Sequence, residues 1–184
     1  MMTCRCCFNA MWLTSTGVAA AILLTGCGAD LAATMQGSSV TDYQAASMFS
    51  PTGHSVAALA DGRFRVTATG SPTTPVARVE KIAAARAAEF GSEQHKKFFQ
   101  TSTPQASIRC GKREYLEKGE KKKLPMTGYS VVEIDVTYAD VASDASFRPV
   151  NATAGALKAE LQADVVAEEA RNQSAAAVRA QCGG

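Results

Sequence analysis

The sequence predicts an α+β fold, in which a small antiparallel sheet of three to four strands packs on one helix at about residues 75–90. Two segments, 63–69 and 128–139, alternate apolar and polar residues, which is typical of strands with one buried face. Residues 76–90 instead repeat apolar side chains with the period of a helix. An alanine-rich stretch near the C-terminus predicts a further helix that docks loosely on this layer.

The first 26 residues have the layout of a secretory signal peptide. Arg5 is the only charged residue before an apolar segment at residues 11–26, which ends in small residues. This segment is shorter than the roughly 20 apolar residues of a membrane-spanning helix. The pattern therefore favours a cleaved signal over a retained N-terminal membrane helix.

The end of this signal, Leu24-Thr25-Gly26-Cys27, resembles a bacterial lipobox. The resemblance implies that Cys27 becomes the lipidated first residue of the mature chain; ordinary cleavage without lipid is the alternative. Gly28 stands where an Asp retains lipoproteins in the inner membrane, so the resemblance also implies the periplasmic face of the outer membrane. The expected location is the bacterial cell envelope, with the membrane bound through the lipid anchor.

Composition divides the rest of the chain into three parts. Residues 27–52 are small and polar with little periodicity, which predicts a lipidated flexible tether. We expect the α+β domain over residues 53–140. Residues 141–184 are predicted to form a linker and the alanine-rich C-terminal helix.

The first strand and the helix after it are the clearest elements. A turn at Ala60-Asp61-Gly62 precedes the strand at 63–69. Thr74 suits the N-cap of the following helix and Pro75 its first position, while Gly91 is predicted as the C-cap. The apolar face of this helix is expected to bury Val76, Val79, Ile82, Ala83, Ala87 and Phe90.

Later segments complete the sheet and the C-terminal helix. Residues 97–103, 106–110 and 128–139 have strand character. The C-terminal helix is expected at about 153–181, with a stripe of Leu157, Leu161 and Val165 that fades into alanines. Docking should therefore weaken beyond Arg171.

Cysteine positions leave one pair in the mature chain. Three of the six cysteines lie in the signal peptide, and Cys27 is the predicted lipid attachment site. Cys110 and Cys182 remain, in a compartment that permits disulfides. A disulfide between them and two separate thiols are both open alternatives.

A basic run extends from Lys96 to Lys123. It holds nine basic residues against three glutamates, a net charge of +6. We predict an exposed loop between two antiparallel strands that carries Lys118, Lys121, Lys122 and Lys123. Such a loop either only keeps the protein soluble or contacts anionic lipid head groups or an acidic envelope protein.

Residues 53–99 resemble a family of small proteobacterial lipoproteins of unknown function. The shared pattern is Gly53-x-Ser55, Leu59-x-x-Gly62-Arg63-Phe64-Arg65-Val66, a break at Gly70, and Arg86-Ala87-Ala88-Glu89 before paired aromatics. This chain departs from the pattern in the turn at residues 91–96, and it has His54 where an aromatic residue is more typical. The resemblance implies a fold and an envelope location, and no activity.

Side chains suited to catalysis are sparse in this sequence. It contains no GxSxG, P-loop or HExxH motif, and neither histidine has metal-ligand spacing to an acid or a cysteine. Arg86 and Glu89 are spaced for an ion pair within a helix. The net charge is near neutral, +2 for the whole chain and +1 once Arg5 is removed with the signal peptide, which argues against a general nucleic-acid binder.

We therefore predict a non-catalytic structural or interaction role, with no cofactor and no metal. The alternative is a periplasmic binding module for a small ligand or an envelope polymer. That alternative predicts a pocket lined by Tyr129, Phe64 or other strand aromatics.

Overall fold

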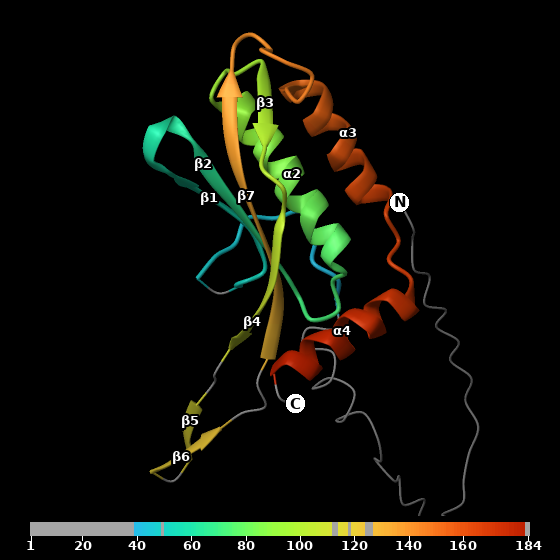
Figure 1. The fold of residues 1–184 in the computed structure, drawn as a ribbon. Helices are drawn as coiled ribbons and strands as arrows, with labels where there is room; N and C mark the ends of the chain where they lie inside the picture. The colour runs from blue at the N-terminus through green and yellow to red at the C-terminus, as the bar shows by residue number, and fades with distance from the viewer. Residues whose placement is uncertain (1–38, 49, 112–113, 118, 124–126, 183–184) are drawn as a thin grey trace, which may run out of the picture.

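The computed structural model describes residues 39–182, except residues 49, 112–113, 118 and 124–126 (Figure 1). The α+β fold class is confirmed. Six strands form one antiparallel sheet in the order β1-β2-β7-β3-β8, with β4 also paired to β7. The sheet is larger than the three to four strands expected, because β1 and the two-residue β8 extend it on either side.

The elements of the domain follow one another in a simple order. The strands of the main sheet are β1 (Gly53–Ala58), β2 (Phe64–Gly70), β3 (Phe98–Thr101), β4 (Gln105–Gly111), β7 (Thr127–Ala139) and β8 (Arg148–Pro149). The helices are α2 (Val76–Glu93), α3 (Val150–Ala163) and α4 (Glu168–Cys182), and a short 3-10 turn, η1 (Ala60–Gly62), joins β1 to β2. A separate two-stranded sheet consists of β5 (Glu114–Glu117) and β6 (Glu120–Lys123).

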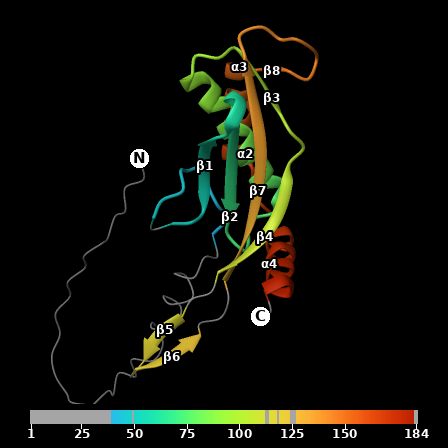
Figure 2. The ribbon, with the colours of Figure 1, turned by 60° about the vertical axis from the view of Figure 1, so that its left-hand side comes forward.

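The long strand β7 is the central strand of the sheet and pairs with β2, β3 and β4. One edge pairs with β2, and the other pairs first with β4 and then with β3 (Figure 2). Between β3 and β4 the chain includes Pro104, which has no N–H to donate to a ladder. Ser102 bridges this break, because its N–H donates to the Asp135 carbonyl at 2.8 Å. The predicted alternation of β7 is confirmed, since Val132, Ile134 and Val136 are buried in the core.

Helix α2 is buried on two sides, against the sheet and against α3. Its alanines at positions 83, 85, 87 and 88 are fully buried, together with Val79 and Ile82. Small side chains let the helix approach both neighbours closely, so the alanine content of the chain here indicates tight packing. Two residues that were predicted on the buried face of this helix are less buried than expected: Val76 is 37% exposed, and Phe90 is only partly buried. Phe90 packs against Phe64, with 5.0 Å between the ring centroids.

The ends of α2 differ from the prediction. Its N-cap is Pro75, and the Thr74 hydroxyl accepts from the Thr41 N–H at 2.9 Å instead of capping the helix. Gly91 does not end the helix, which continues to Glu93. A Cβ on Gly91 would lie 2.6 Å from a ring carbon of Tyr138, so the glycine is required for helix–sheet contact. The predicted C-cap at Gly91 was therefore wrong.

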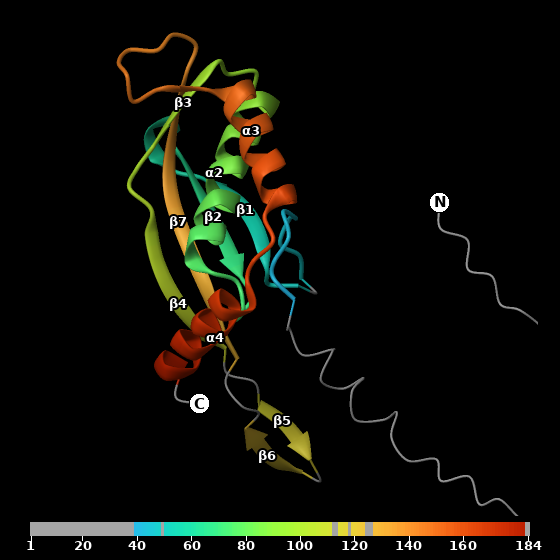
Figure 3. The ribbon, with the colours of Figure 1, turned by 90° about the vertical axis from the view of Figure 1, so that its right-hand side faces the viewer.

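The C-terminal region contains two helices instead of one. Helix α3 runs antiparallel to α2 and buries Val150 and Leu161 against it (Figure 3). Val165 is 91% exposed, because it lies in the connection between α3 and α4. Helix α4 buries Ala175, Val178 and Cys182 against β4 and β7. The predicted loss of docking beyond Arg171 was wrong, since these contacts all come after it.

Residues 39–46 lie against the domain, which differs from the flexible tether predicted over residues 27–52. Thr41 is buried between the β2–α2 turn and α2, and its hydroxyl accepts from the Ser71 N–H at 2.8 Å. Gln44 and Ala46 pair with the backbone of His54 at the outer edge of β1. Composition missed this segment because it has no periodic apolar face: buried hydrogen bonds and the single ring of Tyr43 attach it.

Strands β5 and β6 form an arm that leaves the body of the domain between β4 and β7 (Figures 1 and 2). Lys121, Lys122 and Lys123 were predicted in a loop, and they lie instead in strand β6. Because β6 pairs with β5, the connection between β4 and β7 is a hairpin and not an open loop. Lys118 lies outside the described residues, as does Cys27.

Candidate functional site

A polar junction joins residues 39–46, α2 and α3. It consists of Tyr43, Arg86, Glu89 and Lys158, with Glu89 at its centre. The Glu89 carboxylate accepts hydrogen bonds from the Tyr43 hydroxyl at 2.6 Å, from Arg86 Nη1 at 2.9 Å and from Lys158 Nζ. The predicted ion pair of Arg86 and Glu89 is confirmed, and it is one part of a network that spans three segments.

The charges of the polar junction are paired, because Glu89 accepts from Arg86 and Lys158, and Arg86 also donates to both carboxylate oxygens of Glu93 at 2.6 and 3.0 Å. Burial favours the protonated form of Glu89, but the three donors outweigh burial and lower its pKa to about 2. Burial and the hydrogen bond to Glu89 raise the pKa of the Tyr43 hydroxyl. A carboxylate with so low a pKa is a weak general base at neutral pH. The junction is therefore suited to holding the three segments together.

His54 lies beside this junction. Its ring packs on Tyr43 with 4.7 Å between centroids, and the residue is buried. Burial lowers the pKa of His54, and the nearby positive charge of Arg86 lowers it further. The second histidine, His95, is exposed beyond the far end of α2 and lies apart from this site.

Arg78 fixes the same three segments from the first turn of α2. Its side chain is only 7% exposed. The guanidinium donates to the Thr41 carbonyl at 3.2 Å, to the Leu161 carbonyl at 3.2 Å and to the Asp164 carboxylate at 3.0 Å. It thereby satisfies a carbonyl in the last turn of α3, which has no partner within the helix. Arg78 therefore connects residues 39–46 to α2 and α3.

A cavity of about 480 Å³ opens between these segments. It is lined by Asp42, Tyr43, Arg78, Lys158, Leu161, Gln162 and Asp164. Both of its cations have acidic partners within the domain. Tyr129 and Phe64, which the binding hypothesis named, do not line it: Phe64 packs against Phe90 and Tyr138. The cavity suits a small polar molecule that competes with the existing ion pairs.

Helix α4 is held to the sheet by a disulfide. Cys110 on β4 is bonded to Cys182 at the end of α4, with 5.4 Å between their Cα atoms. Of the two alternatives that the sequence left open, the structure has the disulfide and not two separate thiols. Gly128 allows this approach, since a Cβ there would lie 2.4 Å from a Val178 methyl. A cavity of about 230 Å³ remains where Ile108, Val76 and Val178 meet, so α4 does not fill the space beneath it.

The sheet face opposite α2 is charged and internally paired. Arg65 binds both carboxylate oxygens of Asp135, at 2.7 and 3.1 Å, and Arg109 donates to Glu133 at 2.8 Å. The hydrogen bond from Arg65 lowers the pKa of Asp135. These cross-strand pairs make a polar, solvent-facing surface.

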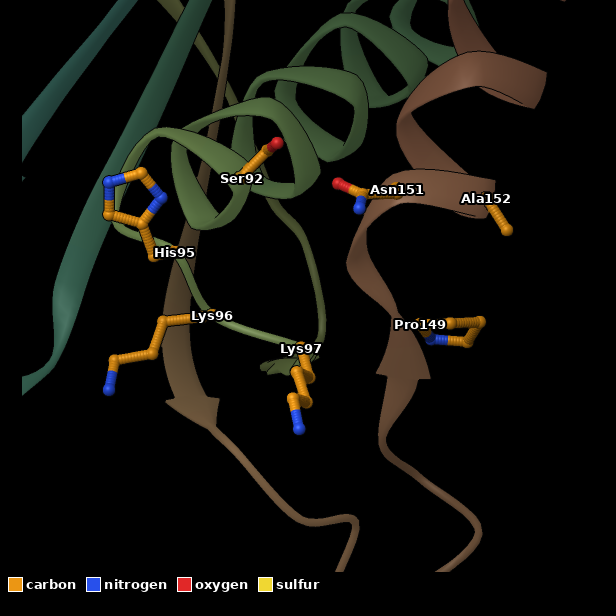
Figure 4. Close-up of a pocket in the computed structure, with 7 residues that line it drawn as sticks. All are labelled: Ser92, His95, Lys96, Lys97, Pro149, Asn151 and Ala152. Carbon is orange, nitrogen blue, oxygen red and sulfur yellow. The ribbon is translucent and has the colours of Figure 1, made fainter.

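An open hollow of about 540 Å³ lies at the end of α2 and the start of α3 (Figure 4). Its lining residues are Ser92, His95, Lys96, Lys97, Pro149, Asn151 and Ala152. Figure 4 shows the Lys96 and Lys97 side chains directed away from α2. Lys96 pairs with Asp140 at 3.2 Å. This basic hollow lies at the opposite end of the domain from the arm.

Sequence reasoning missed Arg78 and Tyr43. Arg78 is four residues before Ile82 and seven before Ala85, so it lies on the same buried face of the helix. A charged residue on an otherwise apolar helix face could have indicated a buried ion pair. Tyr43 gave no signal, because the residues around it have no periodicity. Its role depends on contacts with residues far away in the sequence.

Comparisons with known proteins identify no relative, because no family model, curated protein or solved structure matches this chain. Within the described residues, no helix is long and apolar enough to cross a membrane. The described part of the chain also lacks any group of three or more His, Cys, Asp or Glu side chains placed to hold a metal ion.

Proposed function

We propose that this chain is a lipid-anchored envelope lipoprotein, of the family that residues 53–99 resemble, with a non-catalytic structural or interaction role. Cys27 is its lipid attachment site, and the domain stands at the periplasmic face of the outer membrane. Its partners are the membrane and other envelope proteins.

One observation supports this proposal above the others. The segment that leads from Cys27 reaches the domain at residues 39–46 and is fixed there by buried hydrogen bonds of Thr41 and Arg78. Such an attachment fixes the place at which the chain that follows Cys27 joins the folded body. The polar junction supports a non-catalytic role as well, because its carboxylate is held by three donors of the same chain.

Replacing Cys27 by serine tests the anchor. In cells that lipidate exported proteins, Cys27→Ser should move the protein out of the membrane fraction and remove the mass of the acyl chains. Cys7→Ser is the matched control, because Cys7 lies within the signal peptide and should change neither property. Unchanged membrane association and unchanged mass in Cys27→Ser would contradict the proposal.

The cavity beside the polar junction supports a second candidate, a binding module for an envelope polymer. Co-sedimentation with purified peptidoglycan sacculi tests it. Gln162→Trp should abolish binding, because it fills the cavity, whereas Ala159→Trp on the exposed side of α3 should preserve binding. Absence of wild-type co-sedimentation would remove this candidate.

A further inference from the structure

Strand β4 forms one margin of the main sheet. It pairs along its whole length with β7, from Gln105 opposite Glu133 to Gly111 opposite Thr127. Among the described residues, no strand pairs with its other side. Most residues of β4 are exposed, and Figures 2 and 3 both show the strand beyond β7, on the side away from β1 and β2. The backbone on this side of β4 is therefore open to a partner.

The contacts of β7 show which of its backbone groups point toward β4. The Ser102 N–H donates to the Asp135 carbonyl at 2.8 Å, and the Asp135 N–H donates to the Ser102 hydroxyl at 3.0 Å. The backbone groups of Asp135 therefore point toward the side of β7 that holds β3 and β4. Because this direction alternates along a strand, those of Glu133, Val131 and Tyr129 point the same way.

The backbone groups of β4 divide accordingly between β7 and the open side. Gln105, Ser107 and Arg109 lie opposite those three residues of β7 and bind them. The groups that face the open side belong to the residues that alternate with them: Ala106, Ile108 and Cys110. No hydrogen bond from the described part of the chain reaches the N–H and C=O groups on that side. Three donors and three acceptors of a regular strand are thus left for a partner.

The open edge of β4 lacks the features that keep edge strands apart. Proteins commonly protect such an edge with proline, lysine, a bulge or a covering segment. Residues 105–111 have no proline, lysine or break in register, and their one charge, Arg109, is paired with Glu133 at 2.8 Å. The outer edge of β1 differs, because residues 44–46 bond to the N–H and C=O of His54. Of these two edges, that of β4 is the less protected.

We propose that β4 is a dimer interface, at which it pairs antiparallel with β4 of a second copy about a two-fold axis at Ile108. This register places Ile108 opposite its counterpart and Ala106 opposite Cys110 of the second copy. All three donors and all three acceptors of each strand are then bound. An axis at Ser107 would instead place Cys110 opposite Pro104, which has no N–H.

Charge favours the same register. An axis at Arg109 would place two guanidinium groups directly opposite each other, which destabilises a strand pair. With the axis at Ile108, Arg109 faces Ser107 of the second copy and keeps Glu133 as its partner. Because the edge complements itself in this way, a second copy fits it better than an unrelated peptide does. The interface goes beyond the proposed function and does not depend on the lipid anchor.

Cross-linking between single cysteines tests the interface. In the proposed register the two copies of residue 107 lie about 8 Å apart on the same face of the joint sheet. Ser107→Cys, in the exported chain purified in detergent, should therefore be linked into dimers by a bismaleimide that spans about 8 Å. Ser55→Cys is the matched control, because Ser55 is also an exposed serine and lies on β1, at the other edge. It should stay unlinked.

A second change blocks the open edge and leaves the ladder to β7 intact. Ala106→Pro removes an N–H that faces the partner in both copies, and an edge strand accepts proline where its N–H would face solvent. Added to Ser107→Cys, it should reduce the linked dimer on the order of tenfold. Ala58→Pro, at the end of β1, is its control and should leave the linking of Ser107→Cys unchanged.

Two results would overturn the proposal: equal linking of Ser107→Cys and Ser55→Cys, or undiminished linking after Ala106→Pro. The comparison of the two serine variants stands even where Ala106→Pro lowers the melting temperature, since both serines are exposed. Neither result bears on the lipid anchor, which the fractionation of Cys27→Ser tests separately.

Discussion

The polar junction, with Arg78 beside it, and helix α4 are held to the same domain by different means. Glu89 in the junction and Arg78 next to it each bind partners from several segments through hydrogen bonds. Helix α4 buries three side chains and leaves a cavity of about 230 Å³, and a disulfide secures it. The first region depends on several noncovalent bonds and the second on one covalent bond.

This difference indicates different local stabilities for the two regions. A junction whose charges are paired within the domain suits a structural role. Helix α4 packs on the sheet through few buried side chains. Regions of low contact density open more readily than the core. We therefore expect local opening at α4 before the junction opens.

The largest effect should come from Arg78→Met. This change leaves the Thr41 and Leu161 carbonyls and the Asp164 carboxylate without their shared donor, and should lower the free energy of unfolding by about 3–5 kcal/mol. Lys81→Met is the control, since the exposed pair of Lys81 with Glu160 contributes less than about 1 kcal/mol. Denaturant unfolding measures both. Equal stability of the two variants would show that Arg78 does not hold the segments together.

Removing the disulfide should have a smaller and more local effect. Cys110→Ser with Cys182→Ser should cost about 2–4 kcal/mol, because the bond closes a separation of 72 residues. Hydrogen exchange should accelerate in α4 far more than in α2, since α4 is then held mainly by Ala175, Val178 and the hydrogen bond from Ser174 to the Thr74 carbonyl. Undiminished protection of α4 would contradict the contrast between the two regions.

The smallest effect concerns His54. Its pKa is lowered from 6.5 in the folded protein, so below that pH the unfolded chain binds more protons. Stability should therefore fall as the pH drops from about 7 to 5, by less than about 1.4 kcal/mol per pH unit. His54→Phe keeps the contact with Tyr43 and should flatten this slope. Glu89 contributes little in this range, because its pKa of about 2 affects stability only below its ordinary value of 4.5. Parallel slopes would show that His54 does not cause the pH dependence.

The fold could be predicted where burial repeats along the sequence. Strand β7 and helix α2 have regular apolar patterns, and both were predicted within a few residues of their bounds. Strand β1 was missed because it is a mostly exposed edge strand of small residues. The break between α3 and α4 was missed because alanine-rich residues continue on both sides of it.

The candidate sites were less predictable, because they depend on contacts between distant residues. Arg86 and Glu89 are three apart and could be paired from spacing alone. The contacts of Glu89 with Tyr43 and Lys158 span 46 and 69 residues, and no local pattern announces them. Cys110 and Cys182 could be named as a pair, but only their positions on β4 and α4 decide that they bond.

Hydrogen exchange with and without a reductant that opens the disulfide tests the account most directly. We expect reduction to accelerate exchange in α4 and to leave exchange in residues 39–46, α2 and α3 unchanged, because buried hydrogen bonds hold those three segments together. Equal acceleration in both regions would contradict the account.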